Sequence, residues 1–270
     1  MFWNAVAILL LVGLLAAIIK LFSDILRQVY AYVIPLFKRY APISEVHRTI
    51  LEKYSAYYNV LNSPQKIVFE KRVQRFMYSK TFIPRSVSKV TDEMRVLISA
   101  SAVQLTFGLG RIFLAHFDKI MIYMDAYYSS ITQKYHLGEV NPRAGIIVIS
   151  WKSFVDGYAN ISDSLNLGIH EMAHAIHFEN RIKNEEYGFL NDDALKQLEI
   201  ITLREMKKIN AGEKHFLRSY AGTNGYEFFA VALEYFFENP VDLRKAIPDL
   251  YATLTCLLQQ DPINLYKLAA

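Results

Sequence analysis

Hydrophobic and polar positions along the chain form one apolar N-terminal run followed by shorter amphipathic and buried segments. From Phe2 to Phe22, only Asn4 and Lys20 interrupt the apolar residues. A helix of about 20 apolar residues can cross the roughly 30 Å hydrocarbon core of a bilayer. The run lacks the basic start and the small-residue cleavage site of a signal peptide. We therefore predict a transmembrane anchor over residues 1–22.

The charges around this run predict its orientation. Lys20, Arg27, Lys38 and Arg39 lie at or beyond its C-terminal end, and no Lys or Arg precedes them. Positive residues are enriched on the cytoplasmic side of membrane helices. We expect a single-pass, membrane-anchored protein with the body of the chain in the cytoplasm.

A helical spacing of apolar residues continues over residues 23–40, and Pro35 and Pro42 then predict a break. We assign residues 23–62 to a connecting helical segment. This segment would either lie on the membrane surface or pack on the domain that follows. Ser63-Pro64 opens the next predicted helix, so we place the main domain at residues 63–270.

The main domain carries both helical and strand patterns. Thr91 is a predicted N-cap, because two acidic residues and the long apolar run Met94 to Leu109 follow it. Short β-branched runs at Lys119 to Met124 and Gly145 to Trp151 predict strands, and Thr81 to Arg85 is a predicted loop. Further helices are predicted over Ser164 to Glu179, Asp193 to Asn210, and Gly225 to Glu238, the last stopped by Pro240. This pattern predicts a mostly helical domain with a small sheet.

Charge and cysteine content exclude a nucleic-acid partner and any site built from paired cysteines. The chain has 270 residues and a net charge of only +4, and its Lys and Arg residues are scattered, so we predict no nucleic-acid partner. The single cysteine, Cys256, cannot form an internal disulfide or a Cys-based metal site.

The most informative motif is His170-Glu171-Met-Ala-His174. Residues four apart project from one face of a helix, so both imidazoles can reach a single metal ion. Glu171 follows the first histidine directly, which places it beside the metal, where it can take a proton from a metal-activated water. We predict His170 and His174 as ligands of Zn²⁺ and Glu171 as the catalytic general base.

A zinc site that keeps an open position for water needs a third protein ligand. Downstream, Asn224 can cap a helix that carries Glu227 in its first turn among apolar residues. A carboxylate in such surroundings is costly unless it meets a cation. Glu234, two turns along the same face, is the alternative ligand, or else a hydrogen-bond acceptor for a ligating histidine. We predict Glu227 as the third ligand.

Four blocks of the sequence, in this order, resemble the Mlc titration factor A (MtfA) family of zinc metallopeptidases. The blocks are Val90 to Ala102, Gly145 to Trp151, Asn166 to His174, and Tyr220 to Phe237. The resemblance covers roughly residues 65–240. It implies a gluzincin-like α+β zinc metallopeptidase domain with aminopeptidase-type activity on small substrates. It also implies that the strand Gly145 to Trp151 is an edge strand that could align a peptide. Family members are tied to binding a glucose-responsive repressor, so a regulatory protein stays open as a partner of this chain.

The block that begins at Tyr220 also resembles the catalytic domain of anthrax lethal factor. This second resemblance implies Glu227 as the third zinc ligand and Tyr220 as a phenol that hydrogen-bonds the oxyanion of the tetrahedral intermediate. The sequence departs from the MtfA pattern at His177, where members often carry Asp. We expect His177 to be a rim or core residue and not a ligand.

Two functions are open at this point. The first is a zinc peptidase that acts through a metal-activated water. The second is a zinc-containing module that sequesters a regulatory protein and has weak or incidental peptidase activity. Glu171 argues against a purely structural zinc site, because such a site has no use for a base beside an open position.

Overall fold

The structure is a computed structural model that describes residues 2–129, 133–159 and 164–267. Its α-helices are α1 (Phe2–Tyr40), α2 (Glu45–Tyr54), α3 (Ala56–Val60), α4 (Ser63–Ser79), α5 (Asp92–Thr106), α6 (Trp151–Ala159), α7 (Leu167–Glu179), α8 (Asp192–Asn210), α9 (Gly225–Glu238), α10 (Pro240–Ala246), α11 (Pro248–Leu258) and α12 (Pro262–Lys267). Two 3₁₀ helices are η1 (Phe107–Leu109) and η2 (Ser219–Gly222). The strands are β1 (Thr81–Pro84), β2 (Lys119–Tyr123), β3 (Tyr127–Ser129), β4 (Lys134–His136), β5 (Gly138–Asn141) and β6 (Ile146–Ser150). The predicted combination of many helices and a small sheet is confirmed.

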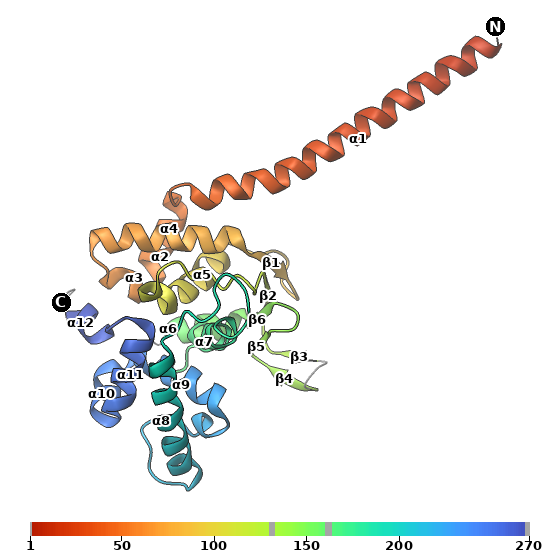
Figure 1. The fold of residues 1–270 in the computed structure, drawn as a ribbon. Helices are drawn as coiled ribbons and strands as arrows, with labels where there is room; N and C mark the ends of the chain where they lie inside the picture. Colours follow the sequence, from red (N-terminus) through yellow and green to blue (C-terminus); the bar gives the residue numbers. More distant parts are fainter. Residues whose placement is uncertain (1, 130–132, 160–163, 268–270) are drawn as a thin grey trace.

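The main sheet has the order β1-β2-β6-β5. Strands β1, β2 and β6 are parallel, and β5 pairs antiparallel with β6. Helix α7 contacts β5 and β6, and the hairpin β3–β4 lies beside this end of the sheet (Figure 1). The sheet therefore presents the short strand β5 as the edge next to α7.

Two predictions about the sheet are wrong. The strand Gly145 to Trp151 is β6, which lies between β2 and β5 and is not an edge strand. The edge strand beside α7 is β5, which contains one β-branched residue, Val140, and so gives no strand pattern in the sequence. The predicted loop Thr81 to Arg85 contains β1, which pairs with β2 despite Pro84 because an edge strand tolerates proline.

The N-terminal region also differs from expectation. Helix α1 continues through Pro35 to Tyr40, so the predicted break at Pro35 is wrong. Among the residues described, no helix combines the length and the apolar character that a membrane crossing requires. The predicted anchor over residues 1–22 is therefore not supported. The cytoplasmic location stays a prediction.

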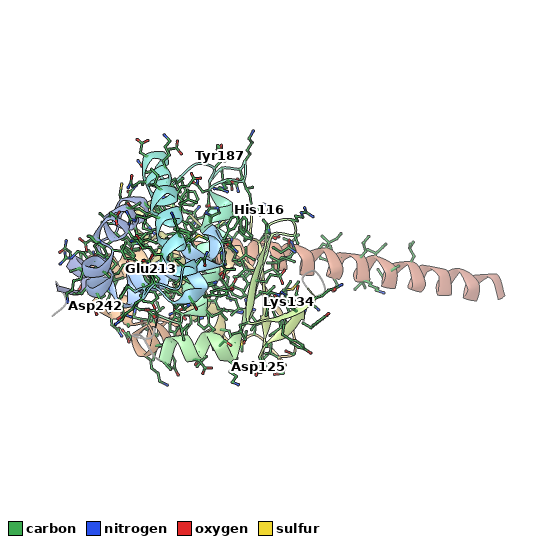
Figure 2. The ribbon with its side chains drawn as sticks, turned by 90° about the horizontal axis from the view of Figure 1, so that it is seen from below. His116, Asp125, Lys134, Tyr187, Glu213 and Asp242 are labelled. Atoms are coloured by element: carbon green, nitrogen blue, oxygen red, sulfur yellow. The ribbon has the colours of Figure 1, made fainter. Side chains whose placement is uncertain are left out.

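The last turns of α1 contact the rest of the protein. The Gln74 side chain of α4 donates to the Lys38 carbonyl at 2.8 Å. The remainder of α1 extends away from the other elements in both views (Figures 1 and 2). Helices α2 and α3 contribute Leu51, Tyr57 and Tyr58 to the same core as the later helices. The predicted division of the chain at residues 22 and 62 stays a prediction.

Helix α9 lies at the centre of the core and also carries polar residues toward α7. Its buried apolar side chains are Phe228, Phe229, Ala230, Val231, Ala232, Leu233, Phe236 and Phe237. The predicted caps are confirmed: Thr91 accepts from the Met94 amide, and Asn224 accepts from the amides of Tyr226 and Glu227. These caps fix where α5 and α9 begin.

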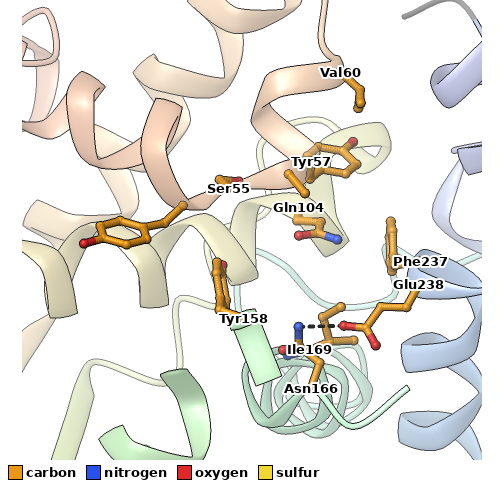
Figure 3. Close-up of a pocket in the computed structure, with 11 residues that line it drawn as sticks. Ser55, Tyr57, Val60, Gln104, Tyr158, Asn166, Ile169, Phe237 and Glu238 are labelled. Atoms are coloured by element: carbon orange, nitrogen blue, oxygen red, sulfur yellow. Dashed lines mark hydrogen bonds between the residues drawn. The ribbon is translucent and has the colours of Figure 1, made fainter. Parts of the chain in front are cut away.

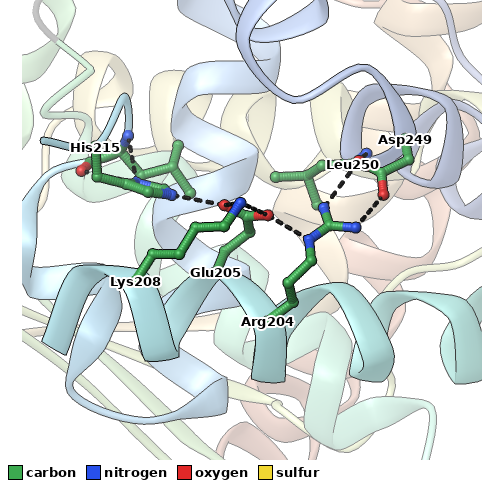
Figure 4. A network of polar contacts seen from close by, with 7 residues as sticks. Arg204, Glu205, Lys208, His215, Asp249 and Leu250 are labelled. Atoms are coloured by element: carbon green, nitrogen blue, oxygen red, sulfur yellow. Dashed lines mark hydrogen bonds and ion pairs between the residues drawn. The ribbon is translucent and has the colours of Figure 1, made fainter. Parts of the chain in front are cut away.

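A buried carboxylate, Glu205 on α8, anchors the segment that leads toward η2. It is 2% exposed and accepts hydrogen bonds from Arg204, Lys208 and His215 (Figure 4). Burial raises the pKa of Glu205, but the bonds from His215, Lys208 and Arg204 outweigh it and lower the pKa to about 2. Arg204 also forms a two-point ion pair with Asp249.

Candidate metal centre

Helix α7 brings two imidazoles together. Asn166 caps the start of the helix, and its side chain accepts from the Ile169 amide at 3.0 Å. One turn separates His170 from His174, and their Nε2 atoms lie 3.1 Å apart. Two ring nitrogens of one helix thus converge on the same point, as the sequence predicts.

Helix α9, which packs on α7, supplies a carboxylate to this point. Glu227 Oε2 lies 3.0 Å from His170 Nε2 and 3.6 Å from His174 Nε2. Two zinc–ligand bonds of about 2.0–2.1 Å at a tetrahedral angle place their ligand atoms about 3.3 Å apart. The three interatomic distances lie on either side of this value. The donor set of two imidazoles and one carboxylate therefore fits a metal ion with a fourth position open.

The charge of the metal-free cluster favours a cation. Burial lowers the pKa of His170, but hydrogen bonds to Glu227 and Glu234 outweigh it and raise the pKa to about 10. Burial raises the pKa of Glu227, but its hydrogen bonds with His170 and His174 lower the pKa well below its usual range. The carboxylates around the imidazoles therefore stabilise positive charge, whether a proton or a metal ion carries it.

Glu171 lies beside the cluster and is not part of it. It is 4% exposed, and within the described part of the chain its Oε2 atom has no hydrogen-bond partner. Burial raises the pKa of Glu171. A carboxylate whose pKa moves toward neutrality is a better general base at physiological pH.

Strand β5 passes directly over Glu171 at Gly138. A Cβ atom added at Gly138 would lie 2.3 Å from Glu171 Oε1. Only glycine leaves room for this carboxylate. Sequence reasoning missed Gly138, and the available signal was a lone glycine in a short extended segment.

Glu234 lies on the far side of His170 from the cluster. It is 1% exposed, and its Oε1 atom accepts from His170 Nδ1 at 2.8 Å. Of the two roles open for Glu234 in the sequence, the contact with Nδ1 corresponds to that of an acceptor for a ligating histidine. Sequence reasoning also missed Arg218, which donates to both oxygens of Glu234.

Two further predicted residues lie near the cluster. Tyr220 is 49% exposed in η2, and its ring centroid lies 6.0 Å from that of His170. Burial and the Glu227 carboxylate raise the pKa of Tyr220 to about 12, so its hydroxyl is a donor at neutral pH. His177 lies outside the cluster, with its ring 4.8 Å from that of Tyr226, and burial lowers its pKa to about 4.

The cluster lies in a cleft formed by two adjoining cavities of 510 Å³ and 290 Å³. Both cavities are lined by His136, Gly138, His170, Glu171 and Tyr220. Strand β5 forms one wall, and residues of β4, α6, α7, α9 and η2 line the rest of the cleft. An extended chain in this cleft would therefore pass between the edge of the sheet and the metal cluster.

A separate cavity of 240 Å³ lies behind α7 (Figure 3). It is lined by Tyr57, Tyr158 and Asn166, whose side chain donates to Glu238 at 2.9 Å. It contains no residue of the metal cluster, so the cleft on the other face of α7 is the candidate site.

Known proteins resemble this chain over most of its length. A family model described as glucose-regulated metallo-peptidase M90 matches residues 36–259. An uncharacterized protein from Synechocystis sp. is 28% identical over 236 residues, which are 81% of this chain and 84% of that protein. Mlc titration factor A of Pectobacterium atrosepticum is 27% identical, covering 72% of this chain and 78% of that protein. Mlc titration factor A of Yersinia pestis is 25% identical, covering 77% and 82%.

Proposed function

This chain belongs to the glucose-regulated metallo-peptidase M90 family, and from that premise we propose that it is a zinc-dependent peptidase. His170, His174 and Glu227 would hold the zinc ion, and Glu171 would act as general base. The observation that carries this proposal is the convergence of the three ligand atoms, which lie within 4.8 Å of one another, beside a buried carboxylate.

The chemistry follows from the residues around the cleft. A bound zinc ion would make a water molecule acidic near neutral pH and polarise the scissile carbonyl. Glu171 would take a proton from the attacking water and give it to the amine nitrogen as the C–N bond of the peptide breaks. The Tyr220 hydroxyl donates a hydrogen bond to the oxyanion as negative charge develops. Glu234 holds His170 Nδ1, which keeps Nε2 directed at the ligand cluster.

We also assign the substrate-aligning role to β5. The outer side of this strand has no partner strand among the described residues, so an extended peptide could add to it through main-chain hydrogen bonds. The 290 Å³ cavity is also lined by Glu139, whose carboxylate is neither a proposed ligand nor the proposed base, and no described Lys or Arg lines it. This charge distribution suits a substrate with a free amino group, which supports aminopeptidase-type activity on small peptides.

A second candidate function is a zinc-containing module that sequesters a regulatory protein and cleaves peptides weakly or incidentally. The names of the relatives from Pectobacterium and Yersinia favour it, because they describe titration of Mlc. In that case the same cluster would stabilise the binding domain.

The substitution Glu171→Gln separates the two functions. It keeps the size of the side chain and the three metal-binding residues but removes the base. We expect zinc-loaded wild type to cleave members of a peptide library, as measured by mass spectrometry. The cleavage rate of the variant should be lower by about 10²–10⁴-fold. No cleavage by fully zinc-loaded wild type would favour the binding module, and Glu171→Gln would then serve as bait for the partner.

A further inference from the structure

The carboxylate of Glu234 is fully engaged although it lies outside the metal cluster. Oε1 accepts from His170 Nδ1 at 2.8 Å and from Arg218 Nη2 at 2.6 Å. Oε2 accepts from the Asn166 amide at 2.7 Å and from Arg218 Nη1 at 3.2 Å. Four hydrogen bonds thus fix a carboxylate that is 1% exposed.

Arg218 joins three segments that are distant in sequence. Its two Nη atoms form a two-point contact with Glu234 on α9. Nη1 also donates to the Ser164 carbonyl, which precedes α7. Arg218 itself directly precedes η2, which carries Tyr220. One guanidinium therefore links the helix of the two histidines, the helix of the carboxylates and the turn of the phenol.

Neither the sequence motif nor the proposed mechanism assigns a role to this link. We propose that Arg218 is a positioning residue with two effects. Through Glu234 it fixes the His170 ring so that Nε2 meets the other ligands, and through η2 it sets the position of Tyr220. This inference rests on the proposed function, because it concerns the geometry of the same metal site.

The chemistry of the contact favours arginine over lysine at this position. A planar guanidinium matches both oxygens of a carboxylate, whereas an ammonium group is a single point of charge. Glu171, Glu227 and Glu234 place three carboxylates close together. Arg218 neutralises the charge of Glu234, which lies outside the metal cluster. Without it, Glu234 would be a buried charge with two of its four hydrogen bonds missing.

Two consequences can be measured separately. A loose Glu234 lets the His170 ring rotate, so zinc affinity falls. Loss of the residue that acts on a metal-ligating histidine typically weakens metal binding about 10–100-fold. A displaced Tyr220 lowers kcat with little change in KM, even when zinc saturates the site, because the oxyanion forms only after the substrate binds.

The test compares Arg218→Ala and Arg218→Lys with wild type in the full-length chain. Zinc affinity is measured by competition with a chromogenic chelator, which requires no enzymatic activity. We expect about 10–100-fold weaker zinc binding for Arg218→Ala and a smaller loss for Arg218→Lys. The visible absorption spectrum of the Co²⁺-substituted protein should change in both variants, because it reports the ligand geometry.

Arg48→Lys is the matched control. Arg48 on α2 also makes a two-point contact with a carboxylate, Glu70 on α4, but it lines neither cavity of the cleft. We expect this variant to keep the wild-type zinc affinity and Co²⁺ spectrum. If Arg218→Ala does not fold, Glu234→Gln tests the same link, because the amide nitrogen that replaces Oε2 is a donor and cannot accept from Arg218 Nη1 or from the Asn166 amide.

The outcomes separate the inference from the proposed function. Wild type that binds zinc tightly, together with Arg218 variants of equal affinity and unchanged Co²⁺ spectrum, would overturn the positioning role and leave the peptidase proposal intact. Wild type that binds no zinc would overturn the proposed function itself. Lower thermal stability of the variants at unchanged zinc affinity would show a merely structural contact and would also refute the inference.

Discussion

The substitution Gly138→Ala tests the position of the proposed base from the opposite wall of the cleft. Glu171 packs against the backbone of β5 at this glycine. An added Cβ atom would lie 2.3 Å from Glu171 Oε1 and 2.5 Å from Cδ, whereas ordinary contacts begin at 3.4 Å. The carboxylate must therefore move by about 1.1 Å, the difference between 3.4 Å and 2.3 Å.

The size of the effect follows from this displacement. A misplacement of about 1 Å costs about 10²-fold in rate, and the complete loss of a general base costs about 10²–10⁴-fold. We expect kcat to fall about 10²-fold, or about 2.7 kcal/mol of transition-state stabilisation. Glu171 Cγ would also lie 2.6 Å from the added atom, so the buried side chain as a whole must shift, and Gly138→Ala should lower the stability of the protein as well.

The assay measures kcat, KM and zinc content of Gly138→Ala alongside Glu171→Gln. Gly225→Ala is the matched control, because its nearest contact would be Thr202 Cγ2 at 3.9 Å, although the residue lies only two positions before Glu227. Zinc content should stay at the wild-type level in all three variants. A kcat for Gly138→Ala within twofold of wild type would refute the assignment of Glu171 as a base held against β5.

Three further perturbations have defined outcomes. Tyr220→Phe should lower kcat by about 10²–10³-fold with KM nearly unchanged. An unchanged kcat with a raised KM would contradict an oxyanion role. Glu227→Ala should remove most of the bound zinc while His177→Ala should not, as measured by metal analysis after dialysis; the reverse result would reassign the third ligand. Glu205→Gln should destabilise the protein by about 1–3 kcal/mol at pH 7. Because the folded-state pKa of Glu205 is lowered to about 2, its contribution to the free energy of unfolding is present above the unfolded pKa of about 4.3 and is lost as pH falls toward 2. Equal denaturant unfolding curves of wild type and variant at pH 7 would contradict this prediction.

The helices that carry the site could be predicted because their signals are local. A capping residue before an apolar stretch marks the start of α5 and of α9, and the spacing of His170 and His174 requires only that one helix form. The edge of the sheet could not be predicted. Strand β5 is short and polar, and its pairing with β6 depends on contacts distant from its own sequence. The apolar run at the N-terminus predicted an anchor that the structure does not support.

The site shows the same division between local and distant information. The spacing of two histidines and a glutamate on one helix predicted His170, Glu171 and His174 as site residues. The position of an acidic residue in an apolar helix predicted Glu227 as the third ligand. Gly138 and Arg218 have no such signal, because each acts through a residue far away in the chain. Gly138 is recognised only when β5 lies over α7, and Arg218 only when η2 lies against α9.

The most direct test of the account is a zinc titration of metal-free protein, followed by peptide cleavage. If His170, His174 and Glu227 form one catalytic metal site, cleavage should be absent without metal. It should then rise linearly with added zinc and reach its plateau at about one equivalent per chain. Peptide cleavage that persists in protein shown to be free of metal, or full zinc occupancy without any cleavage, would contradict the claim that this cluster is the active site of a peptidase.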